Sequence, residues 1–485
     1  MNLGSEESWL SFLLANSPTI AALVVALYVL AGVCAIREVM NSRTAQGSIA
    51  WLLSLIILPF PAAFLYLVFG WKLFDDYAAL QTHSGRKARI TRAKDLYLLD
   101  LKANKEWPVL ARVSELPFLS GNEAKLLIDG EATFKSIFDG ISRAKSYVLA
   151  QFYIIRDDAL GREFADRLIE RAKAGLSVHL IYDDVGCFNL DKRYFKRLRE
   201  AGVHVGSFNQ RHKTLRLYGP ARINYRSHRK VVVVDGEEAW VGGHNVGVEY
   251  LGQDKRFGHW RDTHVHVRGP AALSCALVFR EDWQWATGEV LPGGIPTAVE
   301  TPGDQSVLVM PSGPADTLEE CAIAFTEVMS RARKRLWIVS PYFVPDLDIQ
   351  TALHAAALRG VDVRVLIPKR PDHLLVWLAS NAHANSMVAH DVAIYRYGKG
   401  FLHQKVVLVD DQIASVGTVN FDNRSFAINF ELTLWFTGEQ MISDIAAMLE
   451  KDFSEAHLTT MEEVDATPWR HRFIDQAAKL LSPIL

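Results

Sequence analysis

Two uncharged, largely apolar runs occupy the N-terminal end of the chain. No side chain carries a fixed charge between Ser8 and Ile36, and the same is true of residues 44–71. Each run is long enough for the roughly 20 residues that a membrane-spanning helix needs. Pro59 and Pro61 interrupt the second run, but a membrane helix tolerates proline where neighbours satisfy the freed carbonyls. The pattern predicts an anchor over residues 1–72, with spanning helices at about 17–36 and 48–71.

Two other structures fit such runs, namely a signal peptide followed by a core helix, or two buried helices of a soluble domain. A signal peptide begins with a basic segment. This chain has Glu6 and Glu7 there and no lysine or arginine before Arg37. The sequence therefore favours the two spanning helices.

The basic residues give conflicting indications of membrane orientation. Arg37 and Arg43 flank the loop between the two runs and favour a cytoplasmic loop, since short loops rich in Lys and Arg stay on that side. With two crossings, such a loop would place the C-terminal region outside. A basic cluster between Lys72 and Lys94 favours a cytoplasmic C-terminal region instead. The cysteines show no disulfide pattern, which slightly favours the cytoplasmic face.

Beyond a juxtamembrane linker at residues 73–120, strand-like and helix-like segments alternate in the same order twice. The first half predicts strands at 125–128, 147–153 and 177–182, with helices at 132–144 and 160–174. The second half predicts strands at 306–310, 335–342 and 361–367, with helices at 316–332 and 347–358. This alternation is typical of α/β structures with helices on the faces of a mixed sheet. We expect two lobes, at 121–295 and 305–485, joined by a Pro/Gly-rich segment at 291–304 and related by a pseudo-twofold axis.

Composition narrows the classes of function. The formal net charge is −2, so the chain lacks the basic field typical of a nonspecific nucleic-acid binder, and we expect no nucleic-acid partner. Hydrophobic residues make up 49% of the chain, which is consistent with a membrane segment. The four cysteines share no metal-ligand spacing, and a disulfide framework is not expected in so long a chain.

One pattern of polar residues occurs twice, at residues 224–250 and 401–426. The first copy contains His228-x-Lys230 and Asp235, followed by a glycine pair and Asn245. The second copy contains His403-x-Lys405, Asp410, Gly417-Thr418 and Asn420. In both copies, six residues separate the aspartate from the first glycine. Two copies with the same tail at the same offset indicate an internal repeat.

Each copy presents an imidazole and an ammonium at the end of a buried strand. Side chains alternate between the faces of a strand, so His228 and Lys230 point the same way, as do His403 and Lys405. Asn245 and Asn420 then return from the next strand, after small residues that allow close backbone approach to a ligand.

Two such halves face to face suit a phosphate or phosphodiester. Lysines and carboxamides hold the nonbridging oxygens and offset charge in the transition state. One histidine attacks phosphorus while the other protonates the leaving alkoxide, and the roles reverse in the second step. Fixed cations replace a metal, so we expect neither metal nor cofactor. Plainer alternatives are a turn role for Asp235, which precedes a glycine, and a core role for a lone strand histidine.

These two stretches resemble the duplicated HKD motifs of the phospholipase D superfamily. With two N-terminal spanning helices, and with the sequences WRDTHV and NFELTL after the motifs, the whole chain resembles the bacterial cardiolipin synthases of that superfamily. The resemblance implies a phosphohistidine intermediate and an acidic residue that orients each histidine. By position, these acids are Asp262 in the first lobe and Glu431 in the second. The resemblance also implies that His228 is the nucleophile and His403 the acid.

The resemblance further implies a phosphatidyltransferase of the bacterial inner membrane. The two predicted spanning helices make it multi-pass, and the cysteine usage favours the cytoplasmic face for its lobes. Two molecules of phosphatidylglycerol would give cardiolipin and glycerol. The same residues fit a hydrolytic phospholipase D or phosphatidyl transfer to another alcohol. A nuclease of the superfamily and a non-catalytic lipid-binding scaffold are the remaining alternatives. The sequence leaves the acceptor alcohol open.

Three further features have both a functional and a structural explanation. His264 and His266 lie two apart, which fits a metal pair or the polar positions of a strand. Arg424 fits a contact with a second lipid phosphate or a solvated arginine. Residues 374–388 predict an amphipathic helix, which packs against the other lobe or dips into the bilayer.

Overall fold

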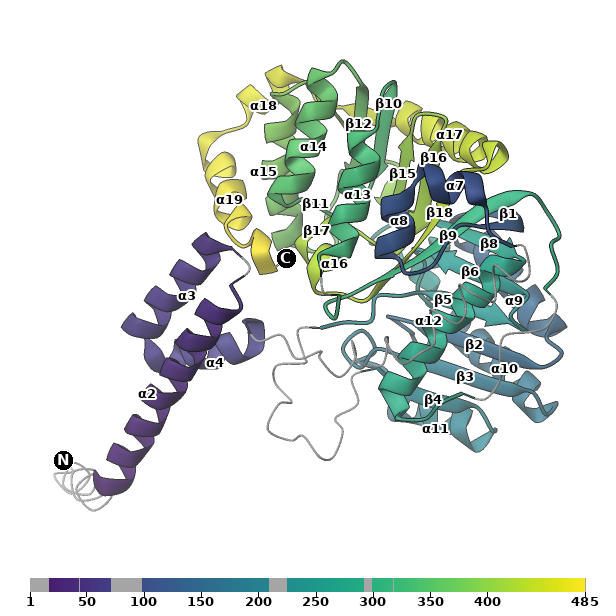
Figure 1. Ribbon diagram of the computed structural model, residues 1–485, viewed down its shortest axis with the longest axis horizontal. Coiled ribbons are helices and arrows are strands. Elements are labelled where there is room, and N and C mark those ends of the chain that lie inside the picture. The colour runs from purple at the N-terminus through teal and green to yellow at the C-terminus, as the bar shows by residue number, and fades with distance from the viewer. Residues whose placement is uncertain are drawn as a thin grey trace. The chain divides into compact units, whose positions relative to one another are not determined.

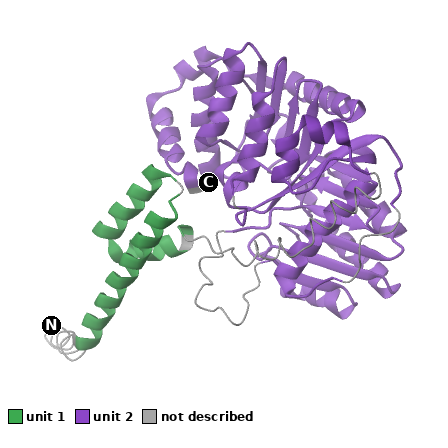
Figure 2. Cartoon of the chain, in the orientation of Figure 1, with its two compact units in different colours: residues 1–73, 211–224 green, residues 74–210, 225–485 purple. Residues whose placement is uncertain are grey.

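The computed structural model describes residues 17–42, 44–70, 98–208, 225–291, 299–316 and 318–484. The chain divides into two compact units, residues 1–73 with 211–224 and the remainder of the chain (Figure 2). The basic cluster between Lys72 and Lys94, most of the predicted linker and residues 292–298 of the joint lie outside the described residues.

The smaller unit contains the helices α2 (Ser17–Met40), α3 (Ala45–Ile57) and α4 (Pro59–Phe69). Among the described residues, α2 is the one helix that is long and apolar enough to cross a membrane. The prediction of a second spanning helix at 48–71 is wrong, because the chain leaves the helical conformation at Leu58. Pro59 and Pro61 have no N–H to continue the helical hydrogen bonds, and they start a new helix instead.

The larger unit is built on one sheet of fifteen strands, which runs through both halves of the chain (Figure 1). Its order is β19-β13-β12-β10-β15-β16-β18-β9-β1-β8-β6-β5-β2-β3-β4. The strands of the first half are β1 (Leu119–Ile128), β2 (Tyr147–Phe152), β3 (Ser177–Tyr182), β4 (His204–Ser207), β5 (Val231–Val234), β6 (Glu238–Gly242) and β8 (Thr263–Arg268). Those of the second half are β9 (Gln305–Ser312), β10 (Arg335–Val339), β12 (Asp362–Pro368), β13 (Ala393–Tyr397), β15 (Val406–Val409), β16 (Ile413–Gly417), β18 (Glu431–Phe436) and β19 (Ala456–Leu458).

The strand order shows that the two lobes repeat one plan. Reading outward from the antiparallel β1–β9 pair at the centre, each lobe has four antiparallel neighbours and then two strands in parallel pairing. The second lobe adds the antiparallel strand β19 at its edge. The strands β5 and β15, which follow the two His-x-Lys pairs, occupy equivalent places in this order. The predicted duplicated α/β fold with a mixed sheet is therefore confirmed, and the lobes join edge to edge into one continuous sheet.

Helices cover both faces of this sheet because the inner strands are apolar on both sides, as in the fully buried run VVVV of β5. On one face, α12 (Pro270–Thr287) and α17 (Glu439–Ser454) pack on a core that extends across both lobes. On the other face, the first lobe is covered by α9 (Asp129–Arg143), α10 (Ala159–Lys173) and α11 (Lys192–Glu200). The second lobe is covered there by α13 (Glu320–Ser330) and α14 (Leu347–Leu358).

Short elements complete the unit. Two strand pairs lie outside the main sheet, β11 (Phe343–Val344) with β17 (Phe421–Asp422), and β7 (His259–Arg261) with β14 (Gly400–Leu402). The part of the predicted linker that the structure describes forms α7 (Leu101–Glu106) and α8 (Pro108–Val113), and its Trp107 and Leu110 are buried in the core of the second lobe. The remaining elements are η2 (Val248–Leu251), α15 (Leu374–Val388), α16 (Asn423–Ala427), α18 (Met461–Ala466), α19 (Trp469–Lys479) and η3 (Ser482–Ile484).

The predicted helix at residues 374–388 is present as α15, but its expected packing is wrong. It lies against α19, β11 and β13 of its own lobe. Its small residues Ala379, Ala382 and Ala384 are buried, which explains the close packing.

Candidate active site

The two His-x-Lys pairs enter the site immediately before β5 and β15, and the opposite lobe holds the backbone of each histidine. The His228 N–H donates to the carbonyl of Phe430 at 2.9 Å, and the His403 N–H donates to the carbonyl of Arg261 at 2.8 Å. The hydrogen bond of His403 continues the parallel pairing of β14 with β7, which also joins the two lobes. Each histidine is therefore positioned by a segment of the lobe to which it does not belong.

The acidic partners of the histidines are exchanged between the lobes in the same way. Nδ1 of His228 lies 2.9 and 3.0 Å from the carboxylate oxygens of Glu431, and Nδ1 of His403 lies 2.7 Å from Oδ2 of Asp262. Both carboxylates are completely buried, so their charge is not screened by water. The structure brings together all four predicted residues, with Asp262 serving the histidine of the second lobe and Glu431 that of the first. With Nδ1 occupied, Nε2 is the ring nitrogen left for a reacting group.

Both motif lysines are buried next to their histidines. Nζ of Lys230 donates to the carbonyl of His228 at 2.7 Å. Nζ of Lys405 donates to the carbonyl of His403 and lies 2.9 Å from Nδ1 of the same residue. Burial lowers the pKa of Lys230 to about 7 and that of Lys405 to about 8, against the attraction of the two site carboxylates. An anionic ligand would restore the charge of both groups, as a phosphodiester site requires.

The pKa shifts of the histidines agree with the cross-lobe contacts, which bring the two motifs into one site. Burial lowers the pKa of His403 well below its usual range, and the ammonium groups of Lys405 and Lys230 lower it further. Burial also lowers the pKa of His228 to about 4, although the Glu431 carboxylate favours the protonated ring. Burial therefore favours the neutral form of both imidazoles in the free site, and the negative charge of a bound phosphodiester would favour protonation of one of them.

The predicted asparagines lie at the site, and the structure uses their side chains differently. Asn245 is buried; its Oδ1 accepts from the N–H of Ile154 at 3.0 Å, and its Nδ2 donates to the Tyr250 hydroxyl at 3.2 Å. Asn420 is also buried, and its Oδ1 has no hydrogen-bond partner among the described residues. An unpaired buried polar atom is unfavourable, so Asn420 is the one whose amide is available to a ligand.

The small residues of the motifs leave room for neighbouring protein atoms rather than for a ligand. A Cβ on Gly243 would lie 2.0 Å from Oδ1 of Asp262, and one on Gly417 would lie 2.6 Å from the carbonyl of Leu432. The prediction that these residues admit close approach of a ligand is therefore corrected. They allow the Asp262 carboxylate and the neighbouring strand to approach closely, and Asp262 in turn orients His403.

Asp235 and Asp410 were predicted to act in catalysis, but both lie at the far end of their strands. The Asp235 carboxylate accepts the backbone N–H groups of residues 145–147, and Asp410 accepts those of residues 333–335. Four strand residues lie between each aspartate and its motif lysine, which places the two about 16 Å apart along the strand. Both aspartates have positive φ, 54° and 51°, as a turn requires. Both therefore have the geometry of a turn residue whose carboxylate holds the start of the neighbouring strand, β2 or β10. For Asp235 this is the alternative that the Asp-Gly pair suggested.

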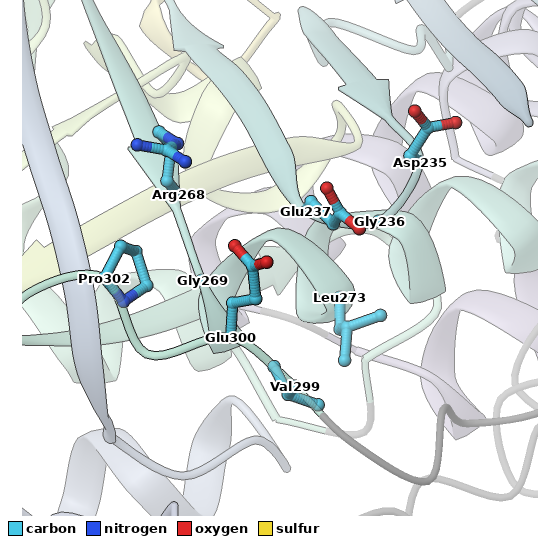
Figure 3. A pocket seen from close by; sticks show the side chains of 9 residues that line it. All are labelled: Asp235, Gly236, Glu237, Arg268, Gly269, Leu273, Val299, Glu300 and Pro302. Atoms are coloured by element: carbon cyan, nitrogen blue, oxygen red, sulfur yellow. The ribbon is translucent and has the colours of Figure 1, made fainter. Parts of the chain in front are cut away.

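Figure 3 shows the hollow beside the Asp235 turn, and it is separate from the histidine site. It is lined by Asp235, Gly236, Glu237, Arg268, Gly269, Leu273, Val299, Glu300 and Pro302. Acidic side chains outnumber the single basic one, so the hollow does not suit a phosphate.

Residues between and around the motif positions hold the site together, and the sequence did not identify them. Arg229, between His228 and Lys230, is buried and donates to Asp282 at 2.6 Å and to the carbonyl of Glu431 at 2.9 Å. Gln404 occupies the same position in the second motif and accepts from the hydroxyl of Thr263 in the other lobe at 2.9 Å. The position between His and Lys therefore connects the lobes. No periodicity could show this, because the partners lie far away in the chain.

Two more side chains contact His228 or its acidic partner Glu431. Thr418 donates from its hydroxyl to Glu431 at 2.5 Å and orients that carboxylate. The ring of Tyr153 meets that of His228 edge to face at 5.3 Å, and its hydroxyl accepts from Arg226 at 3.2 Å. Arg424 also lies in this region, because its charge and that of Arg226 both lower the pKa of Tyr153, which burial raises.

The predicted alternative of a metal at His264 and His266 gains no support. Nδ1 of His264 lies 3.0 Å from Nδ1 of His244, whereas His266 pairs with Glu238 at 2.8 Å on the other face of β8. Among the described residues, no group of three or more His, Cys, Asp or Glu side chains has a geometry that could hold a metal ion.

Comparison with known proteins identifies relatives along nearly the whole chain. Residues 137–255 and 325–456 match a family model described as cardiolipin synthase, PLD-like domain. Cardiolipin synthase A of Pseudomonas aeruginosa LESB58 is 43% identical over 472 residues, which cover 96% of both chains. Cardiolipin synthase A of Pseudomonas fluorescens Pf-5 is 42% identical and covers 96% of this chain and 98% of its own. Among solved structures, phosphatidylserine synthase of Haemophilus influenzae Rd KW20 has the same fold, with a TM-score of 0.59 and 16% identity over 79% of this chain and all of its own.

Proposed function

Since this chain belongs to the cardiolipin synthase, phospholipase D-like family, we propose that it makes cardiolipin and glycerol from two molecules of phosphatidylglycerol. The observation that carries the proposal is the pair of complete motifs, in which each histidine is oriented by a buried carboxylate of the other lobe. A scaffold that only binds lipid would have no use for this arrangement.

In the first step, Nε2 of His228 attacks the phosphorus of one phosphatidylglycerol. The bond between phosphorus and the headgroup glycerol oxygen breaks, and His403 gives its proton to that oxygen, so that glycerol leaves. The phosphatidyl group is then bonded to His228. Lys230 and Lys405 neutralise the nonbridging oxygens during this transfer, and the Glu431 carboxylate stabilises the positive charge that develops on the His228 ring.

In the second step, a free hydroxyl of another phosphatidylglycerol headgroup attacks the same phosphorus. His403, now neutral, takes the hydroxyl proton, the bond between phosphorus and Nε2 breaks, and cardiolipin leaves. His403 is thereby protonated and His228 is neutral, as they were before the first attack. Transfer to a lipid alcohol rather than to water is favoured where the site is anchored at a surface crowded with acceptor lipid.

The surroundings of Nδ1 support His228 as the nucleophile. This atom of His228 faces only acceptors, the Glu431 carboxylate and the carbonyl of Thr418 at 3.1 Å, so it carries the proton and leaves a lone pair on Nε2. Nδ1 of His403 faces an acceptor in Asp262 and a donor in Lys405. That ring is free to carry a proton on Nε2, which a general acid requires.

The remaining site residues receive supporting roles in this proposal. Asn420 would donate from Nδ2 to a nonbridging oxygen of the substrate, and its unpaired Oδ1 can accept from a hydroxyl of the headgroup. Asn245 supports the site through Ile154 and Tyr250 and contacts substrate only when its amide leaves Tyr250. Neither metal nor cofactor takes part, because the lysines supply the positive charge.

The location follows from the anchor and the substrate. Helix α2 carries the membrane anchor, and both lipid substrates reside in the bilayer. We place the protein in the bacterial inner membrane, with its lobes on the cytoplasmic face. The predicted multi-pass arrangement needs the second crossing, which the break at Leu58 does not favour.

The test is turnover by the full-length protein in vesicles of phosphatidylglycerol without added metal, in the presence of EDTA. Cardiolipin and free glycerol should appear in a ratio of one to one. His228→Ala and His403→Ala should abolish both products, whereas His471→Ala, a matched change of an exposed histidine on α19, should leave them unchanged. Phosphatidic acid as the main product would make the protein a hydrolase. An absence of turnover by correctly folded protein would favour a lipid-binding scaffold.

A further inference from the structure

The anchor contains a sharp break between two short apolar helices. At 1.5 Å per residue, α3 with 13 residues is about 20 Å long and α4 with 11 residues is about 16 Å long. Neither spans the roughly 30 Å of a bilayer core. In Figure 1, α3 and α4 are two separate helices beside α2.

Contacts with α2 show that α3 and α4 run in opposite directions along it. The start of α3 and the end of α4 meet at Glu38, which accepts from the Ser48 hydroxyl at 2.6 Å and is hydrogen-bonded to Tyr66. Trp51 and Tyr66 also stack edge to face at 5.3 Å. At the other end of the pair, just after the break, Phe60 lies against Tyr28 at 5.3 Å. The two helices thus form a hairpin, with its open end near Glu38 and its turn near Tyr28.

The contacts also give the depth of the hairpin. Tyr28 and Glu38 are ten positions apart in α2, which is about 15 Å along the helix axis. Between Ser17 and Glu38, α2 itself extends over about 32 Å, enough to cross the hydrocarbon core. If α2 crosses the bilayer, the turn of the hairpin lies near its midplane.

The surface and the turn of the hairpin both suit hydrocarbon. The outward side chains are large and apolar, including Leu53, Ile56, Ile57 and Phe64, each more than half exposed. The first N–H groups of a helix have no partner within it, and unsatisfied donors are costly in lipid. Pro59 and Pro61 carry no N–H, so two of these donors are absent from the first turn of α4.

We propose that residues 45–69 enter the bilayer as a re-entrant hairpin and leave it on the side from which they entered. Helix α2 alone crosses, so the N-terminus lies on one side of the membrane and both catalytic lobes on the other. The surface of the hairpin is then a contact site for lipid acyl chains. This inference is independent of the reaction proposed above.

The charges of the sequence favour this topology and give its direction. With two crossings, the arginines beside residues 41–44 and the basic cluster between Lys72 and Lys94 would lie on opposite sides, so one of them would violate the positive-inside rule. With a re-entrant hairpin, both lie on the same side. The N-terminal tail has Glu6 and Glu7 and no lysine or arginine, as expected of the opposite side. The lobes are therefore cytoplasmic and the N-terminus is outside.

The test is labelling of single cysteines in the full-length protein with a maleimide that does not cross membranes. The probes are Ser5→Cys in the N-terminal tail, Ser42→Cys between α2 and α3, and Ala174→Cys on an exposed site of the first lobe. Each is placed in a protein whose native cysteines are replaced, and only variants that retain lipid turnover are scored. Asn41→Cys replaces Ser42→Cys if that variant is inactive. The native cysteines to be replaced are Cys34, Cys187, Cys275 and Cys321.

In intact spheroplasts, Ser5→Cys should be labelled at least tenfold faster than the other two probes. In inverted membrane vesicles, Ser42→Cys and Ala174→Cys should be labelled at least tenfold faster than Ser5→Cys. Labelling of Ser42→Cys and Ala174→Cys from opposite sides would show two crossings and overturn the hairpin. Labelling of both from outside would overturn the proposed direction.

Discussion

Replacing Glu431 with glutamine tests whether a carboxylate of the second lobe controls the histidine of the first. The substitution keeps the size of the side chain and removes its charge. Glu431 is completely buried and lies within 3.0 Å of Nδ1 of His228, with Thr418 as its other close partner. The glutamine oxygen can still accept from Nδ1, so the histidine keeps its place while the charge that stabilises its cationic form is lost.

The magnitude follows from the value of a hydrogen bond to a charged group. Such bonds contribute about 1.5–3 kcal/mol, and each 1.36 kcal/mol changes a rate tenfold. Turnover should therefore fall by about 10- to 150-fold. The Glu431 carboxylate also raises the pKa of Lys230 against the larger effect of burial. Its loss should move the alkaline decline of kcat/KM, set near pH 7 by that lysine, to lower pH.

The assay measures cardiolipin formed from phosphatidylglycerol in vesicles, at several pH values and equal amounts of folded protein. Glu439→Gln serves as the matched control, since Glu439 is an exposed acid of the same lobe on α17. That variant should keep the wild-type rate and pH profile. A loss smaller than threefold in Glu431→Gln, with an unchanged alkaline limb of the pH profile, would refute control of His228 by Glu431 of the other lobe.

Three further outcomes are expected. In the wild type, kcat/KM should decline as pH rises through about 7 to 8. Burial lowers the pKa of Lys230 and Lys405 to this range, and the neutral lysines cannot bind the phosphodiester. A flat profile of kcat/KM up to pH 9 would contradict this. Asp410→Ala should lower the free energy of unfolding by about 2–4 kcal/mol, because it removes hydrogen bonds to the backbone. A denaturant titration measures this loss, and the cardiolipin assay should show unchanged turnover by the folded protein. Arg229→Met should destabilise by about 3–5 kcal/mol because it removes the guanidinium partner of the buried Asp282 carboxylate. Adding Asp282→Leu should recover part of that loss in the same titration.

The periodicity of the chain was sufficient to predict the repeated α/β plan, because each strand and helix is specified locally. The bounds of β3 and α14 agree with the predicted ranges 177–182 and 347–358. The spanning segment at 48–71 was predicted wrongly for a local reason as well. Hydropathy measures how apolar a run is, and it does not register that Pro59 and Pro61 remove two helical hydrogen-bond donors from the middle of the run.

Residue types and their spacing were sufficient to predict one part of the site. The histidines, lysines and asparagines stand at equivalent places in the two copies, and the fold brings the copies together. Asp235 and Asp410 have the same regularity, yet they serve the turns that end β5 and β15. A repeated motif contains residues that stabilise the strand and its turn as well as residues that contact the substrate. Position along the strand separates the two classes, because the aspartates lie one full strand away from the lysines.

The exchange of acids between lobes depends on how the two halves of the sheet meet. Asp262 precedes β8 and Glu431 begins β18, and these strands flank the central β1–β9 pair. Joining the lobes at that pair carries each acid across to the histidine of the other lobe. The site is therefore complete only when β1 and β9 pair and join the two lobes. Neither copy of the motif has an oriented histidine by itself, so the catalytic unit of this fold is the pair of lobes and not the repeat.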